Sequence, residues 1–439
     1  MKRTNAIILI SLLTTLLNAQ SLLQSGPMLG YSELREVAIW VQTTNSANVY
    51  IEYWQPHEPE KKYTTSDITT EKEKAFTAIL IADQVEPGNR YQYRLVINNE
   101  TVELPYPTKF QTQPLWRWRT DPPEFSFATG SCAYINEAAY DRPGNPYGSE
   151  YEIFEAINES KPDFMIWLGD NMYLREPDWN SWTGITKRWT HSRSVPEMQP
   201  LLASAHHYAI WDDHDYGPNN SDRGWWNKNQ TYEAFQLFWA NPSYGIGDMK
   251  GVITQFQWND VDFILLDNRY YRTPNKLIAE NKTILGEQQK QWLKDALASS
   301  LSTFKVVAMG GQFLNDVGKY ETYSNNGFEK ERQEIIDFIY KQQIKNVVFL
   351  TGDRHHTELS VLEEDGKPRI IDITVSALTS GAGHAREEAN NLRVEGTYTN
   401  KHNYGLISFR GSEKDREMHI QILNKDGQLI WERFFQREK

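Results

Sequence analysis

The sequence predicts an α/β domain with buried sheets, preceded by a small all-β domain. From about Pro122 onward, short apolar runs alternate with longer amphipathic segments, which is the pattern of strands and helices in an α/β domain. Residues 21–113 instead alternate apolar with polar side chains, and Gly, Asn and Pro separate the runs, as in a small β-sandwich. Residues suited to metal binding or acid–base chemistry follow several of the later apolar runs.

The expected strands of the first domain are EVAIWVQTT, ANVYIEYW, FTAILIADQ and NRYQYRLVIN. The segment LPYPTKFQTQP ends this domain, because its prolines indicate a boundary. We therefore expect a first domain at residues 21–113 and a second at residues 122–439.

The second domain is expected to form its sheets from seven apolar runs: FSFATG, DFMIWLG, HYAIW, VDFILLD, FKVVAMG, NVVFLTG and RIIDITVS. Amphipathic helices are expected between them in SEYEIFEAINES, QTYEAFQLFWA, LGEQQKQWLKDALASS and EKERQEIIDFIYKQQ. The tail returns to strands in YGLISFRG, REMHIQILN and QLIWERFFQ, with NKDG as a turn.

The first 20 residues have the pattern of a signal peptide. Lys2 and Arg3 precede an apolar run that ends at Leu17, and the small Ala19 offers a cleavage point. An uncleaved anchor helix is the alternative. No later stretch is apolar enough to span a membrane. The mature chain is therefore expected to be exported, to the periplasm or the extracellular space, and the sequence indicates no oligomeric state.

The composition narrows the possible partners. The chain has 439 residues and a formal net charge of -12, which argues against nucleic-acid binding. An anionic substrate remains possible, because bound metal inverts the local field. Cys132 is the only cysteine, so no internal disulfide forms. A lone cysteine is usually a small buried hydrophobe.

Polar side chains stand where five of the expected strands end. Ligands of α/β domains bind beyond the carboxyl ends of strands, so these residues are expected to meet at one edge. They are Ser131 and Cys132; Asp170 and Tyr173; Asp212, Asp213 and His214; Gln312; and Asp353 and His355.

The motifs GSC, GDNMY, WDDHDYGPNN, LDNRYYR, GGQ and GDRH occur in the order found in the PhoD-like alkaline phosphatases. The mature chain therefore resembles this family of the calcineurin-like metallophosphoesterase superfamily, whose members include phosphodiesterases. Its N-terminal part resembles the fibronectin-like domain that precedes PhoD catalytic domains. The resemblance implies a β-sandwich flanked by helices, in the order αββα.

The resemblance also implies a two-metal site. Asp170 would bridge both metals, and Cys132, Tyr173 and His355 would complete a site for Fe³⁺. Asp213 and Asp353 would hold the second cation with Asp170, and such oxygen ligands suit Ca²⁺, although other divalent ions remain possible. With one negative charge each from the thiolate, the phenolate and the three carboxylates, a ferric and a calcium ion together balance the ligands.

Two residues are implied to act in catalysis. His214 resembles the superfamily's catalytic histidine, which bonds the phosphoryl group or protonates the leaving oxygen. Asp215 would orient the His214 imidazole, and the alternative is that Asp215 caps the next turn.

Three residues are candidates for substrate binding. Asn171 stands where the best-known phosphatase of the family carries Arg. Arg269 would reach a phosphate oxygen, with a buried salt bridge as the alternative. Arg354 would supply positive charge, unless strand alternation turns it away from the site.

The implied reaction is hydrolysis of a phosphate mono- or diester, in which a hydroxide on the ferric side attacks phosphorus in line. Two alternatives are a non-catalytic relative that binds phosphorylated wall polymers and a surface protein whose metals only stabilise the fold. No ligand of the implied set is missing, which argues against the first, and His214 argues against the second.

Overall fold

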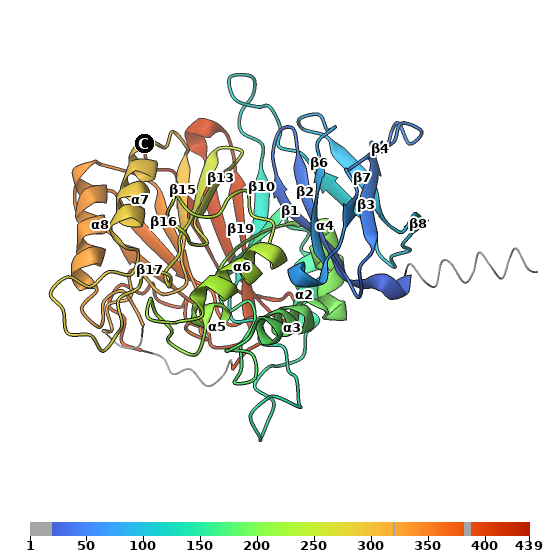
Figure 1. Ribbon diagram of the computed structural model, residues 1–439. Helices are drawn as coiled ribbons and strands as arrows, with labels where there is room; N and C mark the ends of the chain where they lie inside the picture. The colour runs from blue at the N-terminus through green and yellow to red at the C-terminus, as the bar shows by residue number, and fades with distance from the viewer. Residues whose placement is uncertain (1–19, 319–320, 382–387) are drawn as a thin grey trace, which may run out of the picture. The chain divides into compact units, whose positions relative to one another are not determined.

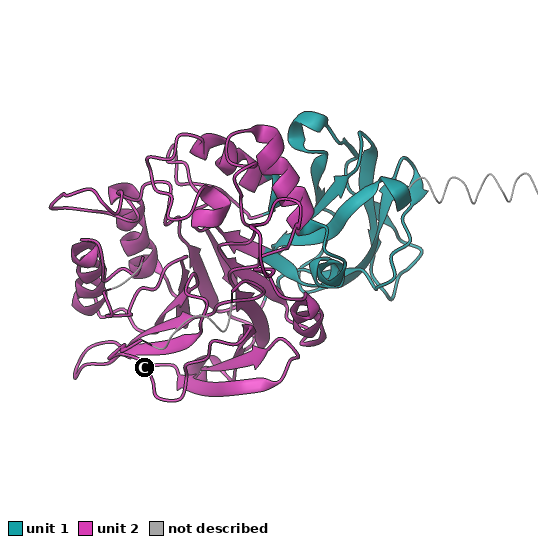
Figure 2. Cartoon of the chain, turned by 90° about the horizontal axis from the view of Figure 1, so that it is seen from below, with its two compact units in different colours: residues 1–115, 193–207, 237–240 teal, residues 116–192, 208–236, 241–439 magenta. Residues whose placement is uncertain are grey.

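The structure, a computed structural model, describes residues 20–318, 321–381 and 388–439. Residues 1–19 of the expected signal peptide lie outside this range. Among the described helices, none has both the length and the apolar character needed to cross a membrane. The chain divides into two compact units, shown in Figure 2: residues 1–115, 193–207 and 237–240 form unit 1, and residues 116–192, 208–236 and 241–439 form unit 2.

Unit 1 is built from two antiparallel sheets. In one sheet β2 pairs with both β1 and β6, and in the other β3 pairs with β4, β5 and β7, while β8 and β9 pair with β7. The strands are β1 (Leu23–Ser32), β2 (Val37–Thr43), β3 (Asn48–Trp54), β4 (Tyr63–Thr64), β5 (Ile68–Thr69), β6 (Thr77–Ala82), β7 (Arg90–Ile97), β8 (Glu100–Thr101) and β9 (Lys109–Gln111). The helices are η1 (Lys72–Lys74), η2 (Pro196–Met198) and α4 (Gln199–Ser204).

The core of unit 1 follows from the alternation in its strands. Every second residue of β3 is buried, so Val49, Ile51 and Tyr53 share one face. They belong to one apolar cluster with Ile39 of β2 and Leu80 of β6. Strands β2, β3, β6 and β7 fall on the four runs whose alternation predicts them.

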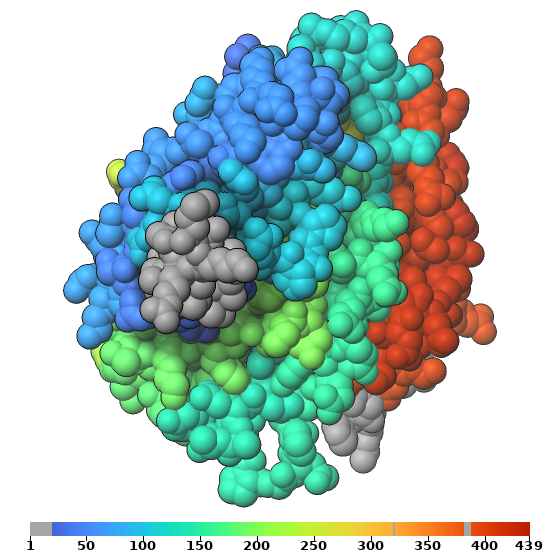
Figure 3. Space-filling model, turned by 90° about the vertical axis from the view of Figure 1, so that its right-hand side faces the viewer, coloured from blue at the N-terminus to red at the C-terminus, as the bar shows by residue number. Residues whose placement is uncertain are grey.

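The first sheet of unit 2 has the strand order β21-β20-β19-β10-β11-β12. Strands β10 and β11 are parallel, and β19 is antiparallel to β10. Figure 3 shows the carboxyl-terminal strands as a continuous red surface. The bounds are β10 (Phe125–Gly130), β11 (Phe164–Leu168), β12 (His206–Ile210), β19 (Asn403–Arg410), β20 (Glu417–Asn424) and β21 (Leu429–Gln436).

The second sheet of unit 2 has the order β13-β14-β15-β16-β18-β17, with β14, β15, β16 and β18 parallel. These central strands are buried throughout, which explains their continuous apolar runs. The bounds are β13 (Thr254–Trp258), β14 (Val261–Leu265), β15 (Phe304–Ala308), β16 (Val347–Thr351), β17 (Glu358–Leu362) and β18 (Ile370–Thr374).

The two sheets of unit 2 pack face to face through aromatic rings. Phe127 of β10 and Phe164 of β11 both contact Phe263 of β14, with ring centroids 5.4 and 5.2 Å apart. Helices α7 (Glu287–Ser299) and α8 (Glu329–Lys341) cover the outer face of the second sheet, where Leu293 and Ile339 share its apolar cluster (Figure 1).

The outer face of the first sheet is covered by α2 (Glu152–Glu159), whose Phe154 packs on Trp167 of β11. The layers are therefore helix, sheet, sheet, helix, as the resemblance implies. The remaining helices connect strands: α3 (Trp182–Arg193), α5 (Asp213–Tyr216), α6 (Lys228–Phe238) and η3 (Glu413–Asp415).

Candidate metal centre

Four of the expected metal ligands lie just beyond strand ends, with the backbone in the left-handed region. Their φ angles are 61° for Cys132, 51° for Asp170, 70° for Asp353 and 52° for His355. Residues other than glycine rarely adopt this conformation, and it persists at functional sites where the surrounding structure holds it. The positions that the sequence marks after β10, β11 and β16 therefore coincide with unusual backbone.

A glycine precedes both Asp170 and Asp353 because other chain segments approach closely there. A Cβ atom on Gly169 would lie 2.7 Å from Cβ of Asp212, and one on Gly352 would lie 2.7 Å from Cβ of Ser131. The two Gly-Asp pairs thus let neighbouring loops come together at the carboxyl ends of both sheets.

Sulfur, carboxylate, phenol and imidazole donors meet in a first group. Cys132 Sγ lies 3.6 Å from Asp170 Oδ2, and Tyr173 Oη lies 3.5 Å from His355 Nε2. The Ser380 hydroxyl lies 3.3 Å from the same Nε2 and accepts a hydrogen bond from Tyr173 at 3.1 Å. The four expected ligands of the first cation are therefore neighbours.

Carboxylates from three strand ends form a second group. One oxygen each of Asp212, Asp213 and Asp353 lie within 4.8 Å of one another, and so do ligand atoms of Asp170, Asp213 and His214. Oδ2 of Asp212 and Oδ1 of Asp213 are buried and have no hydrogen-bond partner in the described part of the chain. Asp212, which the sequence does not assign to the metal site, therefore belongs to this group.

Without a bound cation, the negative charges of these buried carboxylates are not fully balanced by positive groups. Burial raises the pKa of Asp170 well above its usual range, and the nearby Asp213, Asp212, Asp215 and Asp353 raise it further. Burial, with Asp212 and Asp213, raises the pKa of Asp353 to about 8. Such groups keep their charge inside a protein only when a positive partner compensates it. The unpaired oxygens and these pKa directions fit a site that binds metal.

Thiol and phenol donors show the same trend. Burial raises the pKa of Cys132 well above its usual range, and the Asp170 and Asp353 carboxylates add to the effect. Burial, Cys132 and Asp170 raise the pKa of Tyr173 in the same way. Both groups would lose their protons on binding a cation, since thiolate and phenolate are the ligand forms.

His214 lies beside the carboxylates at the start of α5. Its backbone N–H donates to Asp170 Oδ1 at 3.2 Å, and its ring centroid lies 4.3 Å from that of Tyr173, with the two rings tilted by 32°. Burial lowers the pKa of the imidazole. The buried Nδ1 has no hydrogen-bond partner within the described residues, so this nitrogen remains for a bound group.

Asp215 takes the capping role that the sequence left as its alternative. Its Oδ2 accepts a hydrogen bond from the backbone N–H of Asp212 at 3.0 Å. Its Oδ1 accepts from the N–H groups of Asn171 and Met172 at 2.9 and 3.3 Å. Asp215 therefore fixes the β11 and β12 loops against each other, and it does not bond Nδ1 of His214.

Arg269 forms the buried salt bridge that the sequence gave as the alternative to substrate contact. Its side chain is 1% exposed; Nε pairs with Asp212, and Nη1 lies 2.6 Å from Glu321. Its Nη2 lies 3.7 Å from Asp213. Arg269 thus compensates part of the acidic charge behind the second group.

Arg354 and Asn171 are also engaged with protein atoms. Arg354 donates to Gln312 at 2.9 Å and to Glu388 at 2.8 Å, so its guanidinium is turned toward these two residues. Asn171 donates from Nδ2 to the Ile210 carbonyl at 2.7 Å, while its Oδ1 is buried and unbonded among the described residues.

The structure adds Arg175, which the sequence analysis missed. Its side chain is buried, its guanidinium lies over the rings of Tyr134 and Tyr173 at 4.6 and 5.6 Å, and Nε donates to Tyr134 Oη at 3.0 Å. The positive charge of Arg175 contributes to the lowered pKa of His214, after burial and against Asp213. The signal for it was an arginine two positions after Tyr173.

Comparisons with known proteins match both parts of the chain. The sequence profile of the PhoD-like phosphatases matches residues 127–420, and a profile described as a domain of unknown function matches residues 20–115. Alkaline phosphatase D of Bacillus subtilis (strain 168) is 26% identical over 371 residues, which are 71% of this chain and 60% of that protein. The chain thus spans less than two thirds of the length of this relative.

Two solved structures share the fold. A structure of PhoD superposes with a TM-score of 0.77 and 19% identity, covering 95% of this chain and 91% of that one. A purple acid phosphatase from yellow lupin (Lupinus luteus) seeds gives a TM-score of 0.69 and 10% identity, covering 94% and 74%. Both likenesses confirm the fold class that the sequence resemblance implies.

Proposed function

The chain belongs to the PhoD-like phosphatase family, and we propose that it is a metal-dependent hydrolase of phosphate mono- or diesters. One observation carries the proposal: the six expected ligands come from distant segments and lie in one cluster, which includes Asp170, beside a histidine with an unbonded nitrogen. The relative from Bacillus subtilis, named an alkaline phosphatase, supports the same reaction class.

The donor sets of the two groups differ, and this difference supports two different cations. Cys132, Asp170, Tyr173 and His355 would hold Fe³⁺, since thiolate, phenolate and imidazole favour a transition metal. Asp170, Asp213 and Asp353, with Asp212, would hold Ca²⁺, which prefers oxygen ligands. When bound, the cations supply charge that polarises a phosphoryl group and activates water.

We propose that two further residues of the centre, His214 and Arg175, act on the substrate, and that the protein holds them in place beside the expected ligands. His214 is held beside Asp170 by its backbone N–H, and we propose that its imidazole bonds the phosphoryl group or protonates the leaving oxygen. Arg175 brings positive charge near this imidazole. Arg269 and Arg354 form ion pairs with Asp212, Glu321 and Glu388. In this proposal Arg175 therefore supplies the positive charge beside the substrate.

The substrate would lie outside the cytoplasm. The basic and apolar pattern of residues 1–20 supports export to the periplasm or the extracellular space. The net charge of -12 makes nucleic acid a poor partner.

The test is hydrolysis of bis-p-nitrophenyl phosphate and p-nitrophenyl phosphate by the purified protein, before and after removal of metal by a chelator. We expect hydrolysis of at least one substrate, its loss on chelation and its return with added metal. The His214→Ala variant is the matched control: it should keep its metal and lose activity. A protein that holds metal but hydrolyses neither ester would overturn the proposal.

The metals are tested separately by elemental analysis and the visible spectrum. Iron bound through Tyr173 should give a phenolate-to-iron charge-transfer band that the Tyr173→Phe variant lacks. A colourless protein that holds only zinc would contradict the iron assignment and leave the hydrolase proposal to be judged by the activity assay.

A further inference from the structure

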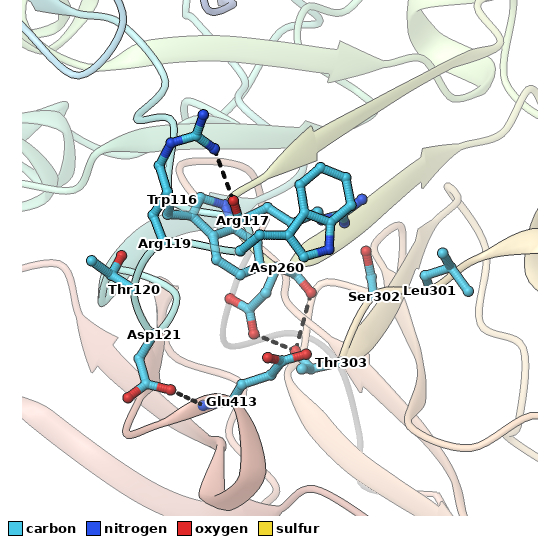
Figure 4. A pocket seen from close by; sticks show the side chains of 11 residues that line it. Trp116, Arg117, Arg119, Thr120, Asp121, Asp260, Leu301, Ser302, Thr303 and Glu413 are labelled. Carbon is cyan, nitrogen blue, oxygen red and sulfur yellow. Dashed lines mark hydrogen bonds between the residues drawn. The ribbon is translucent and has the colours of Figure 1, made fainter.

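A pocket lies at the opposite ends of the strands from the candidate metal centre. It has a volume of about 560 Å³. Its walls come from the segment before β10, from the residues directly before β14 and β15, and from the turn between β19 and β20. Strands of five or six residues place it roughly 20 Å from the carboxyl ends. The lining residues drawn in Figure 4 include no expected metal ligand.

One wall of the pocket is the segment Trp116-Arg117-Trp118-Arg119. Trp118 is 93% exposed, and its φ of 63° places a bulky residue in the left-handed region. The ring of Trp118 therefore offers an apolar face to solvent at the wall of the pocket. Arg117 lies over the Trp116 ring at 5.7 Å, and Arg119 donates to the Arg117 carbonyl at 3.0 Å, so the segment is ordered by its own contacts.

The charged side chains in the floor of the pocket are paired with each other and hydrogen-bonded. Asp260 is buried and pairs with Arg416 at 2.7 Å, and the Thr303 hydroxyl donates to the Asp260 carbonyl at 3.0 Å. Arg416 also donates to the carbonyls of Pro122 and Pro123 at 3.2 and 2.7 Å. At the rim, Asp121 accepts from the Glu413 backbone N–H at 3.1 Å. Figure 4 shows the contacts of Asp260 with Thr303 and of Asp121 with Glu413 below the tryptophan-arginine segment.

The charges around the pocket are balanced. Arg117 and Arg119 at the rim form no ion pair with other residues of the described ranges, and neither do Asp121 and Glu413, apart from the backbone contact of Asp121. The two cations and two anions of the rim offset each other, and Asp260 offsets Arg416. A strongly charged ligand would therefore meet like charge, whereas a neutral ligand would find hydrogen-bond donors, acceptors and flat apolar rings together.

We propose that this pocket binds a neutral saccharide. A sugar ring offers an apolar C–H face that fits the exposed Trp118 ring, and hydroxyl groups that both donate and accept hydrogen bonds. Arg119 supplies donors, Asp121 and Glu413 supply acceptors, and Ser302 and Thr303 supply hydroxyls, all from the pocket lining. The site would hold the enzyme on a glycan while the metal centre, at the other end of the strands, stays open to its own substrate.

An anionic membrane surface is the competing partner for a segment rich in Trp and Arg. The carboxylates of Asp121 and Glu413 face the same pocket, and the chain carries a net charge of -12, so approach to an anionic bilayer is opposed. The saccharide is therefore the occupant that the charge pattern favours.

The test is titration of the full protein with chitotetraose and with cellotetraose, followed by tryptophan fluorescence and by saturation-transfer NMR of the sugar. Vesicles of phosphatidylglycerol form the competing arm. We expect at least one tetrasaccharide to bind, no vesicle binding, and a loss of at least about tenfold in affinity in the Trp118→Ala variant. Trp226→Ala is the matched control, since Trp226 is also exposed (65%) and lies outside the pocket lining, and it should bind as the parent does.

Three results would overturn the saccharide site: neither sugar binds, Trp118→Ala binds as tightly as the parent, or the vesicles bind through Trp118 while the sugars do not. The measurement needs neither phosphate ester nor added metal. Its outcome is therefore independent of whether the metal centre hydrolyses phosphate esters.

Discussion

The two ends of the strands of unit 2 handle buried acid in opposite ways. At the amino ends, Asp260 is paired with Arg416 and bonded by Thr303. At the carboxyl ends, Asp170, Asp212, Asp213 and Asp353 lie together, and Oδ2 of Asp212 and Oδ1 of Asp213 find no hydrogen-bond donor in the described chain. In the first arrangement the buried acid is paired with a buried cation, whereas in the second only part of the acidic charge is paired, by Arg269, and the remaining oxygens fit a site that binds metal.

The backbone of the acidic residues differs as well. The expected ligands Asp170 and Asp353 at the carboxyl ends adopt left-handed φ angles, and each follows a glycine that a neighbouring loop approaches closely. Asp260 has no such φ angle, although Trp118 in the pocket at the amino ends does. Around Asp170 and Asp353, strained backbone and unpaired carboxylate oxygens occur together. A bound group would offset the free-energy cost of both, as expected of a functional site.

The largest expected effect comes from removing one carboxylate at each end. Asp170→Asn should lower hydrolysis by about three orders of magnitude or more, because Asp170 belongs to both donor groups. In the metal-free protein the same change should raise the thermal midpoint, because it removes charge that burial and four neighbouring carboxylates disfavour.

Asp260→Asn is the matched change at the amino ends. It leaves Arg416 buried without its carboxylate, so unfolding free energy should fall by about 3–5 kcal/mol with or without metal. Thermal unfolding of the metal-free and metal-loaded forms checks both variants. If Asp170→Asn destabilised the metal-free protein as much as Asp260→Asn does, the contrast between the two ends would be wrong.

The next effect concerns His214. His214→Ala should reduce kcat by a factor of about 10² to 10⁴, the usual contribution of a positioned acid or base. Metal content should remain unchanged, because the backbone N–H rather than the ring holds Asp170. Activity measured beside elemental analysis decides this; a variant that lost metal together with activity would show that His214 is a ligand.

Much of this arrangement could be predicted from the sequence, because it depends on local patterns. Uninterrupted apolar runs predicted β10, β11, β14, β15 and β16, and the residues directly after them mark the edge where the site forms. The alternation predicted four strands of unit 1. The strands β13 and β17 and the helices α3 and α5 were missed: β13 alternates over only five residues, α5 has only four residues, and β17 and α3 show no clear period.

The partners of the charged residues depend on distant segments and could not be predicted. Arg269 pairs with Glu321, 52 positions along the chain, and Arg354 with Glu388. Asp215 could cap a turn or orient His214, and only the position of the Asn171 and Asp212 backbone decides between them. At left-handed residues such as Asp353, strand alternation also ceases to tell where a side chain points.

A third effect tests how much of the acidic charge Arg269 compensates. Arg269→Met should lower the unfolding free energy by about 3–5 kcal/mol, because Asp212 and Glu321 would lose their buried cation. Arg272→Met is the matched control. Arg272 is equally buried and approaches Glu321 at 3.5 Å, but it forms no ion pair with Asp212 among the described residues, so its loss should be smaller. Denaturant unfolding measures both, and equal losses would assign the effect to Glu321 alone.

The smallest effect belongs to a partly exposed pair at the carboxyl ends of the strands. Lys425, in the turn after β20, pairs with Glu152 at the start of α2, and the two side chains are 42% and 31% exposed. Lys425→Met should change the unfolding free energy by no more than about 1 kcal/mol, because solvent screens exposed ion pairs. Chemical denaturation in low and high salt checks this value. A loss as large as that of Arg269→Met would mean that position at this edge, rather than burial, sets the strength of an ion pair.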